Sequence, residues 1–243
     1  MSVDFSRVDG YGRWLGVEDG KSVRYPSGVR FDVLDEGDVR RIAGTGASAR
    51  VAERRRAACF RGRFEGYSGA RFDRLSPEVD ARALDAAMRI ASSVADGAGD
   101  VRSLVLFGDY GTGKTTLAAC ACNLVIDAGR RAAMTCVGDV ESEISARYGG
   151  SAEVYEALCR NDLVVVDDLA AEGDVGRTPQ RVFELADWLS SQRRVPTIWT
   201  TNLTRGQLAR PSGLMRRAVD RIKQGALLVE VAGPNFRNGR MTI

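Results

Sequence analysis

The stretch Leu106–Leu117, LFGDYGTGKTTL, decides the fold. From Gly108 to Thr115 it fits the pattern G-x-x-x-x-G-K-[ST], and it joins the apolar run 103–107 to a longer apolar run with helical spacing. A glycine-rich turn between a strand and a helix lets backbone N–H groups face a phosphate at the positive end of the helix. The stretch therefore predicts a loop that binds nucleotide phosphates.

Individual side chains in this loop have distinct predicted roles. Lys114 reaches the β- and γ-phosphates as a point charge, the Thr115 hydroxyl is a ligand for Mg²⁺, and Thr116 follows near the α-phosphate. A glycine-rich turn with a chance lysine is the alternative, and the flanking strand and helix argue against it. The predicted nucleotide-binding residues in the loop are Gly108, Asp109, Tyr110, Gly111, Thr112, Gly113, Lys114, Thr115 and Thr116.

The composition is that of a globular protein with few chemical options. The chain has 243 residues, of which 44% are hydrophobic and 28% charged, enough for one domain with a smaller appendage or for a single large domain. The net charge of +3 does not define a partner. Lysine occurs only at Lys21, Lys114 and Lys223, so arginine dominates, which fits either a GC-rich genome or phosphate recognition. The absence of histidine excludes histidine-based catalysis and the commonest metal ligand.

Cysteine usage and the N-terminus indicate a cytoplasmic protein. The 5 cysteines have no framework spacing, which favours free thiols in a reducing compartment. The first residues, MSVDFSRVDG, lack the apolar core of a signal peptide, and no apolar run is long enough to span a bilayer. We therefore expect no membrane association and no structural zinc site.

Residues 1–65 differ in pattern from residues 66–243. The segment 22–34 alternates apolar side chains around a Pro-Ser-Gly turn and predicts a small hairpin. Glycine and serine within 44–48 predict a flexible join, and 49–64 predicts a helix. That helix carries Arg50, Arg54 and Arg61 near one face. This face is interpreted either as a solvated surface or as a surface that docks a partner or nucleic acid.

The rest of the chain alternates short apolar strands with helical patterns. The predicted strands are residues 103–107, 132–137, 163–166, 196–200 and 227–231, and the predicted helices are residues 85–94, 114–127 and 178–192. Such alternation predicts an α/β fold with a parallel sheet and helices on both sides.

Two acids follow the unbroken apolar strand 163–166. Parallel strands end at one edge of the sheet, so Asp167 and Asp168 are expected beside the phosphate loop. Asp167 would hold Mg²⁺, directly or through water, and Asp168 would orient and polarise the attacking water. Acids that merely make a strand end soluble are the alternative. The second acid favours hydrolysis over simple phosphate binding.

The strand 196–200 leads into a further polar residue, Asn202. In the additional-strand class of P-loop ATPases, this strand lies between the phosphate-loop strand and the acid-bearing strand. Asn202 would then contact the γ-phosphate or the attacking water, whereas a turn-capping role is the alternative.

Four motifs in this order resemble the bacterial replicative helicase loaders of the DnaC/DnaI type. These proteins form one family with the IstB transposition ATPases inside the AAA+ superfamily. The motifs are VVVDDLAAEG, VPTIWTTNL, MRRAVDRI and GPNFR, and the resemblance runs from about residue 72 to residue 237. It implies a P-loop NTPase fold of the AAA+ type without a C-terminal helical lid, with ATP and Mg²⁺ as cofactors and ATP hydrolysis as the activity.

The same resemblance implies roles for residues near the C-terminus. Arg221 matches the arginine finger that reaches the γ-phosphate of a neighbouring subunit, which makes the active species a homo-oligomer. Arg217 is the alternative if the register differs by one turn, and a surface ion pair is the alternative for Arg221 itself. Arg237 matches the arginine of a short C-terminal motif with a nucleotide-sensing or structural role.

The resemblance also implies macromolecular partners. Residues 1–65 would dock a replicative helicase, and residues 66–243 would form the ATPase domain that binds single-stranded DNA, with Arg147 and Tyr148 as candidate contacts. The zinc-binding cluster of some family members is absent, since Cys59 stands alone in that region. Two other functions stay open: an IstB-like ATPase assisting a transposase, and a nucleotide-gated adaptor with negligible turnover.

Overall fold

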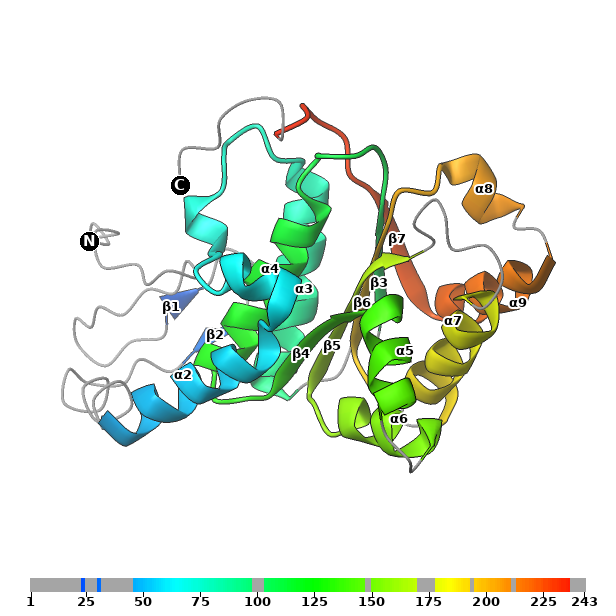
Figure 1. Ribbon diagram of the computed structural model, residues 1–243. Coiled ribbons are helices and arrows are strands. Elements are labelled where there is room, and N and C mark those ends of the chain that lie inside the picture. The colour runs from blue at the N-terminus through cyan, green and yellow to red at the C-terminus, as the bar shows by residue number, and fades with distance from the viewer. Residues whose placement is uncertain are drawn as a thin grey trace.

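A computed structural model describes most of the chain. The described residues are 23–24, 30–31, 46–97, 103–146, 150–169, 178–192, 195–210 and 213–236. A parallel sheet of five strands forms the centre of the fold, in the order β4-β5-β6-β3-β7 (Figure 1). The strands are β3 (Ser103–Phe107), β4 (Ala132–Cys136), β5 (Leu163–Leu169), β6 (Thr197–Thr201) and β7 (Ala226–Glu230). The predicted parallel sheet is confirmed, and so is the placement of β6 between β3 and β5.

Helices cover both faces of this sheet, as predicted. One face is covered by α2 (Gly46–Cys59), α3 (Ala81–Asp96) and α4 (Lys114–Asp127) (Figure 1). The other face is covered by α5 (Val137–Ala146), α6 (Ser151–Cys159), α7 (Thr178–Asp187) and α9 (Gly213–Lys223). Shorter elements are η2 (Gly62–Tyr67), η3 (Phe72–Arg74), η4 (Trp188–Gln192) and α8 (Arg205–Ala209).

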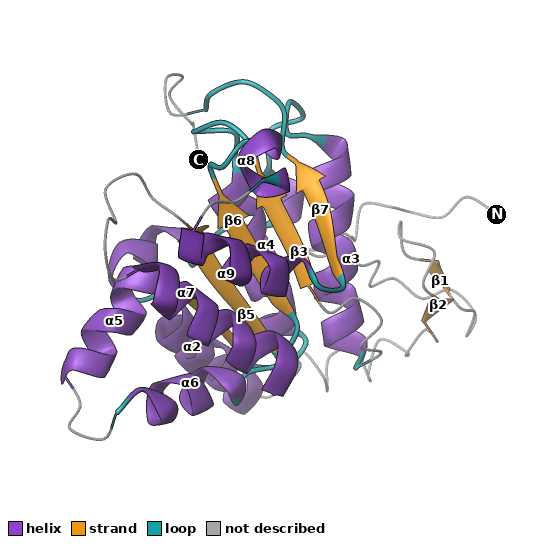
Figure 2. Ribbon diagram, turned by 90° about the vertical axis from the view of Figure 1, so that its right-hand side faces the viewer, coloured by secondary structure: helices purple, strands orange, loops and turns teal. Residues whose placement is uncertain are grey.

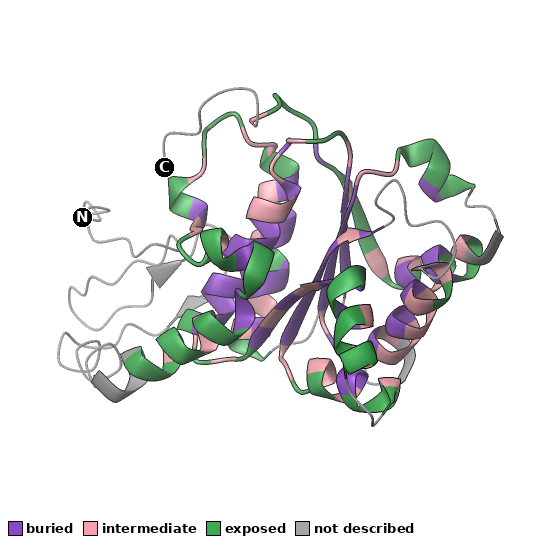
Figure 3. Ribbon diagram, in the orientation of Figure 1, coloured by how far each residue is buried: buried purple, intermediate pink, exposed green. Residues whose placement is uncertain are grey.

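Successive side chains of each strand point to opposite faces of the sheet, so each strand contributes to a hydrophobic core on either face. Leu104 and Leu106 of β3 pack with α3 and α4, whereas Val105 packs with the layer of α7 and α9. Because both faces are covered, β3 and β6 are buried at every position, whereas the edge strand β7 is partly exposed (Figure 3). The strands therefore provide a rigid frame, and the parallel strands β3, β5 and β6 all end at one edge of it (Figure 2).

Several predicted bounds shift in the structure. β5 continues through both acids to Leu169, and β4 ends at Cys136 because Val137 already begins α5. The predicted helix 178–192 is α7 followed by the π-helical turn η4. No pattern in the sequence predicted α5 and α6. None of the helices in the described segments is long and apolar enough to cross a membrane.

The N-terminal part agrees with its predictions only in places. β1 (Val23–Arg24) pairs antiparallel with β2 (Arg30–Phe31), which confirms the hairpin. The join predicted at 44–48 is wrong from Gly46 onward, since α2 begins there, and this helix ends before Arg61. Beyond α2, the buried side chains of Phe60 and Phe64 belong to the same core cluster as β3. Residues on both sides of position 65 therefore share one core. All 5 cysteines are free, as predicted.

Candidate functional site

The phosphate loop lies between β3 and α4, and a Cβ at either of its first two glycines would meet a neighbouring atom at close range. Gly108 has φ 134°, and a Cβ there would lie 2.8 Å from the carbonyl oxygen of Val231. Gly111 has φ 79°, and its Cβ would lie 1.9 Å from Oδ1 of Asn235. A side chain at either position would therefore collide with the segment that follows β7, in addition to straining the backbone.

Lys114 sits inside the curve of this loop. Its ammonium donates hydrogen bonds to the carbonyl oxygens of Gly108 (2.8 Å) and Asp109 (2.6 Å). The Thr112 hydroxyl also donates to the Asp109 carbonyl, over 3.0 Å. Lys114 is only 6% exposed, so these carbonyls compensate for burying its charge. The loop is thus already closed around the cation that would meet a phosphate.

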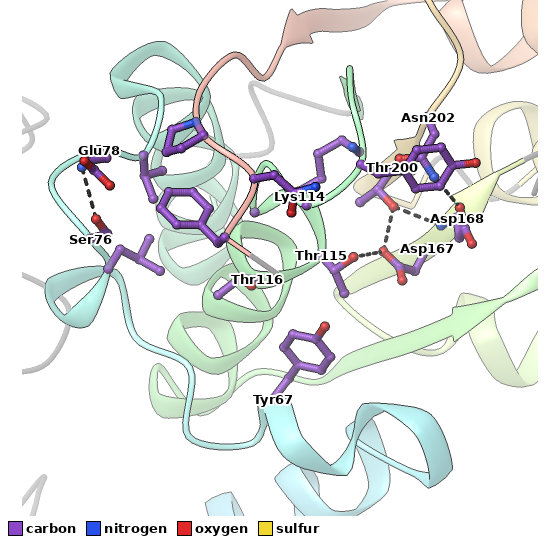
Figure 4. Close-up of a pocket in the computed structure, with 18 of the residues that line it drawn as sticks. Tyr67, Ser76, Glu78, Lys114, Thr115, Thr116, Asp167, Asp168, Thr200 and Asn202 are labelled. Carbon is purple, nitrogen blue, oxygen red and sulfur yellow. Dashed lines mark hydrogen bonds between the residues drawn. The ribbon is translucent and has the colours of Figure 1, made fainter. Parts of the chain in front are cut away.

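The two predicted metal ligands meet at the edge of the sheet. The Thr115 hydroxyl donates to Oδ1 of Asp167 over 2.9 Å, and the Thr200 hydroxyl donates to the same oxygen over 2.6 Å (Figure 4). Burial raises the pKa of Asp167, and the hydrogen bonds from Thr200 and Thr115 oppose that rise. Mg²⁺ binds through a few such oxygens together with phosphate and water, so this pair fits the ion. The sequence analysis did not identify Thr200, although its place before Asn202 was a usable signal.

The second acid has an unusual backbone. Asp168 has φ 56°, and it is the single non-glycine residue with positive φ in the part of the chain that the structure describes. The strand pairing of β5 with β6 is irregular between Val166 and Leu169, which re-aims the intervening side chains. Nδ2 of Asn202 donates to Oδ1 of Asp168 over 2.9 Å, and the Asp168 N–H donates to the Thr200 hydroxyl over 2.9 Å. Asn202 therefore orients the carboxylate that was predicted to activate water.

A cavity of about 570 Å³ connects these groups. That volume lies within the usual range of about 300–1,000 Å³ for small-molecule sites. Of the predicted loop residues, Gly108, Asp109 and Thr112 shape the loop without lining the cavity. Those that line it are Tyr110, Gly111, Gly113, Lys114, Thr115 and Thr116, together with Asp167, Asp168 and Asn202.

Other walls of this cavity come from segments that the sequence analysis did not assign to the site. They are Tyr67, Arg74, Leu75, Ser76, Glu78 and Val79 before the loop, and Pro234, Asn235 and Phe236 after β7. The Phe236 N–H donates to the Gly111 carbonyl over 2.9 Å, and the Ala232 N–H donates to Oδ2 of Asp80 over 3.2 Å. The segment after β7 is thereby tied to the phosphate loop and to the start of α3.

The predicted arginines lie apart from this cavity or outside the described residues. Nε of Arg221 is 3.2 Å from Oδ1 of Asp187 in α7, and Nη1 of Arg221 donates to Gln224 over 3.2 Å. The Arg217 guanidinium stacks 4.7 Å from the centre of the Phe183 ring. Neither arginine lines the cavity of its own chain. Residues 147, 148 and 237, for which roles were also predicted, lie outside the described residues.

Comparisons with known proteins relate this geometry to a family. No protein-family model matches the chain. The replicative helicase loader DnaC of Escherichia coli K12 is 26% identical to it over 148 residues. The chain resembles the DnaC helicase loaders. The match covers 59% of this chain and 59% of the curated relative, and the same figures hold for DnaC of Shigella flexneri.

Solved structures share the fold. DnaI matches with a TM-score of 0.58 and 22% identity, over 75% of this chain and 98% of that one. The DnaC helicase loader matches with a TM-score of 0.56 and 20% identity, over 69% and 99%. AMPPCP-bound DnaA from Aquifex aeolicus matches with a TM-score of 0.50 and 21% identity, over 65% and 51%. These matches confirm the predicted fold, a parallel sheet flanked by helices as in DnaI, DnaC and DnaA, and the curated match supports the resemblance to the DnaC/DnaI loaders.

Proposed function

We propose that this chain is an ATP-dependent loader of a replicative helicase. It binds ATP with Mg²⁺ in the cavity at the sheet edge, hydrolyses the ATP slowly, and delivers a helicase to single-stranded DNA. The observation that carries the proposal is the convergence of Thr115, Asp167 and Asp168 with the closed phosphate loop, in a chain whose curated relatives are helicase loaders. The AMPPCP-bound state of DnaA, which has a similar fold, supports an adenine nucleotide as the ligand.

The hydrolysis follows from the roles of the residues around the cavity. Lys114 and the loop N–H groups hold the β- and γ-phosphates, while Thr115 and Asp167 hold the metal site. Mg²⁺, when bound, neutralises charge that develops on the phosphate oxygens. Asp168 accepts a proton from the water that attacks the γ-phosphorus, as the bond to the bridging oxygen breaks and ADP leaves. Asn202 keeps that carboxylate directed at the water.

Arg221 is proposed to act in a neighbouring copy, in a homo-oligomer. Its ion pair with Asp187 lies on the surface formed by α7 and α9, away from the cavity of the same chain. A guanidinium on an outer surface can stabilise a γ-phosphate only across an interface. Arg237 is proposed to sense the nucleotide, because the segment before it contacts the phosphate loop.

The macromolecular partners proposed for this chain are inferred from the similar proteins named above. Residues 1–65 are proposed to dock the helicase, and residues 66–243 to form the ATPase domain that contacts single-stranded DNA, with Arg147 and Tyr148 among the contacts. The name of the DnaC relatives supports a helicase as the partner. A cytoplasmic location follows from a function in DNA replication.

Helicase loading on a closed circle of single-stranded DNA tests this proposal. The circle has no ends, so a ring helicase can enter only if its ring is opened. We expect the chain with ATP and Mg²⁺ to place its cognate replicative helicase on the circle, and we expect the Lys114→Ala variant to fail. Deposition that is equally efficient without the chain or without nucleotide would refute the loader function. Negligible phosphate release with intact nucleotide-dependent assembly would favour the adaptor instead.

A further inference from the structure

One wall of the cavity comes from η2, which precedes the phosphate loop by about forty residues in sequence. Tyr67, the last residue of η2, lines the cavity, and its hydroxyl end points toward Thr115 (Figure 4). Thr115 and Asp167 meet at this end of the cavity, and Leu75 and Phe236 are among its other lining residues. The proposed phosphates and metal lie beside Thr115 and Asp167, so a phenol oxygen there is on their side of the cavity.

Tyr67 is held in place by a buried amide of α4. Asn123 is fully buried, and its Nδ2 donates to the carbonyl oxygens of Tyr67 (3.1 Å) and Ala70 (3.0 Å). Two carbonyls of the same turn are therefore fixed to the helix that begins at the phosphate loop. A buried polar side chain with satisfied hydrogen bonds specifies one position of the segment it binds. The Asn123 amide thus sets the distance between η2 and α4.

The same amide also contacts α2. Nε of Arg56 donates to Oδ1 of Asn123 over 3.2 Å, and the Arg56 guanidinium forms an ion pair with Asp127, one turn further along α4. Asn123 therefore joins three segments: the helix α2, the turn that carries Tyr67, and the helix of the phosphate loop. Asn123 is therefore one link between α2 and the turn that carries Tyr67.

We propose that Tyr67 is a nucleotide-binding residue and that Asn123 is its positioning residue. The Tyr67 hydroxyl donates to a phosphate oxygen or to a water on the metal, on the Thr115 side of the ligand. The inference rests on the proposed binding of ATP and Mg²⁺, and it adds a contact that lies outside the motifs of the loop and of the acids. It also gives α2 a route by which a partner docked on residues 1–65 changes nucleotide affinity.

Nucleotide affinity measured by calorimetry with the full chain tests the role of Tyr67. We expect Tyr67→Phe to weaken Mg²⁺–ATP binding about three- to tenfold, as for loss of one hydrogen bond, and Tyr67→Ala to weaken it further. The matched control is Tyr155→Phe, which removes a hydroxyl bonded to Glu184 between α6 and α7 and should leave affinity unchanged. Unchanged affinity in both Tyr67 variants would overturn the inference alone. A wild-type chain that binds no nucleotide would overturn the proposed function with it.

A double-mutant cycle tests the role of Asn123. If the amide acts through Tyr67, Asn123→Ala weakens Mg²⁺–ATP binding in the wild-type background and has little further effect in the Tyr67→Ala background. Losses that multiply in the double variant would show that Asn123 does not act through Tyr67. If Asn123→Ala unfolds the chain, Arg56→Ala replaces it, because Arg56 contacts the same amide from α2. Arg56→Ala must then reduce Mg²⁺–ATP affinity in the wild-type background and not in the Tyr67→Ala background.

Discussion

The cavity edge and the surface of α7 and α9 hold their charged groups in different ways. At the cavity, Lys114 is 6% and Asp167 is 7% exposed, and each is bonded to its neighbours in the same chain. On the other surface, the side chains of Arg221 and Asp187 are 34% and 26% exposed. The first arrangement is fixed before any ligand arrives, whereas the second can exchange partners.

This difference has an energetic basis. Removing a hydrogen-bonded partner from a buried charge costs several times more than breaking an exposed ion pair, which is typically worth about 0.2–1 kcal/mol. The pair of Arg221 with Asp187 is half-buried, so for the proposed role in trans Arg221 must exchange a contact of intermediate strength for a triphosphate of a neighbouring copy. Under the proposed function, one chain supplies the binding half of the site, and the pair of Arg221 with Asp187 is the half that assembly would control.

The largest effect on ATP turnover is expected from a substitution of Arg221. We predict that Arg221→Ala lowers ATP turnover by about 10³-fold or more, as arginine fingers do in well-studied cases. Mixing Arg221→Ala with Lys114→Ala should restore part of the activity, because mixed interfaces pair an intact loop with an intact finger. Phosphate release across a range of mixing ratios measures this.

Arg216 offers the matched control for that experiment. It lies on the same helix with an exposed side chain, and its 3.9 Å pair with Asp220 is an i,i+4 contact. Arg216→Ala should change turnover less than about twofold, since such pairs contribute about 0.3–0.5 kcal/mol. Equal losses in the Arg216 and Arg221 variants, or no recovery at any mixing ratio, would contradict a finger in trans.

The next largest effect is expected at Asp168, where a substitution should reduce hydrolysis while nucleotide binding is largely kept. Asp168→Asn should reduce turnover by about 10²- to 10⁴-fold, the usual contribution of a general base. Asparagine tolerates the left-handed backbone of this position, so no folding defect is expected. Affinity for Mg²⁺–ATP should stay within about threefold of wild type, the margin a single weak contact can account for. Hydrolysis at the wild-type rate would remove Asp168 from its role.

A smaller effect tests how the segment after β7 supports the loop. Gly111 and Gly129 both have φ 79°, but a Cβ at Gly129 meets nothing within 4 Å, whereas one at Gly111 meets Asn235. Both alanine variants should lose about 1–2 kcal/mol of stability from backbone strain. Gly111→Ala alone should also lose about tenfold in nucleotide affinity, or about 1.4 kcal/mol. Equal affinities in the two variants would mean that Asn235 gives way freely.

The sequence predicted those parts of the structure that depend on local pattern. The strand 103–107, the helix 114–127 and the loop between them are fixed by apolar spacing and glycine chemistry, and the structure reproduces their bounds. The placement of β6 between β3 and β5 followed from the pattern of the additional-strand class of P-loop ATPases. By contrast, α5 and α6 lack a strong periodic pattern, because their short apolar faces pack on α7 and η4 and are specified only by tertiary contact.

The walls of the cavity were beyond local prediction for a similar reason. Tyr67 reaches the site through hydrogen bonds to Asn123, 56 positions later, and no spacing in the sequence encodes that pairing. Asn235 and Phe236 reach it because β7 lies next to β3 and ends at the same edge. The partner of Arg221 was also not predictable, since Asp187 approaches from α7 across a helix-helix contact.

The smallest expected effect concerns the stability of the metal-free chain. Burial raises the pKa of Asp167 above the ordinary aspartate value of about 3.9, so the folded chain holds this proton to higher pH than the unfolded chain. Its contribution to stability therefore falls as pH rises from about 4 through the folded pKa, and stays low at neutral pH. The Asp167→Asn variant has no carboxyl group to ionise at this position and therefore does not lose this stability. The difference between its melting temperature and that of the wild type should increase across that pH interval. Thermal melts from pH 3 to 7 without Mg²⁺ measure the difference, and adding Mg²⁺ with ATP should reverse it, because only the carboxylate gains a cation. A constant difference at every pH would show that the ionised carboxylate costs the fold nothing.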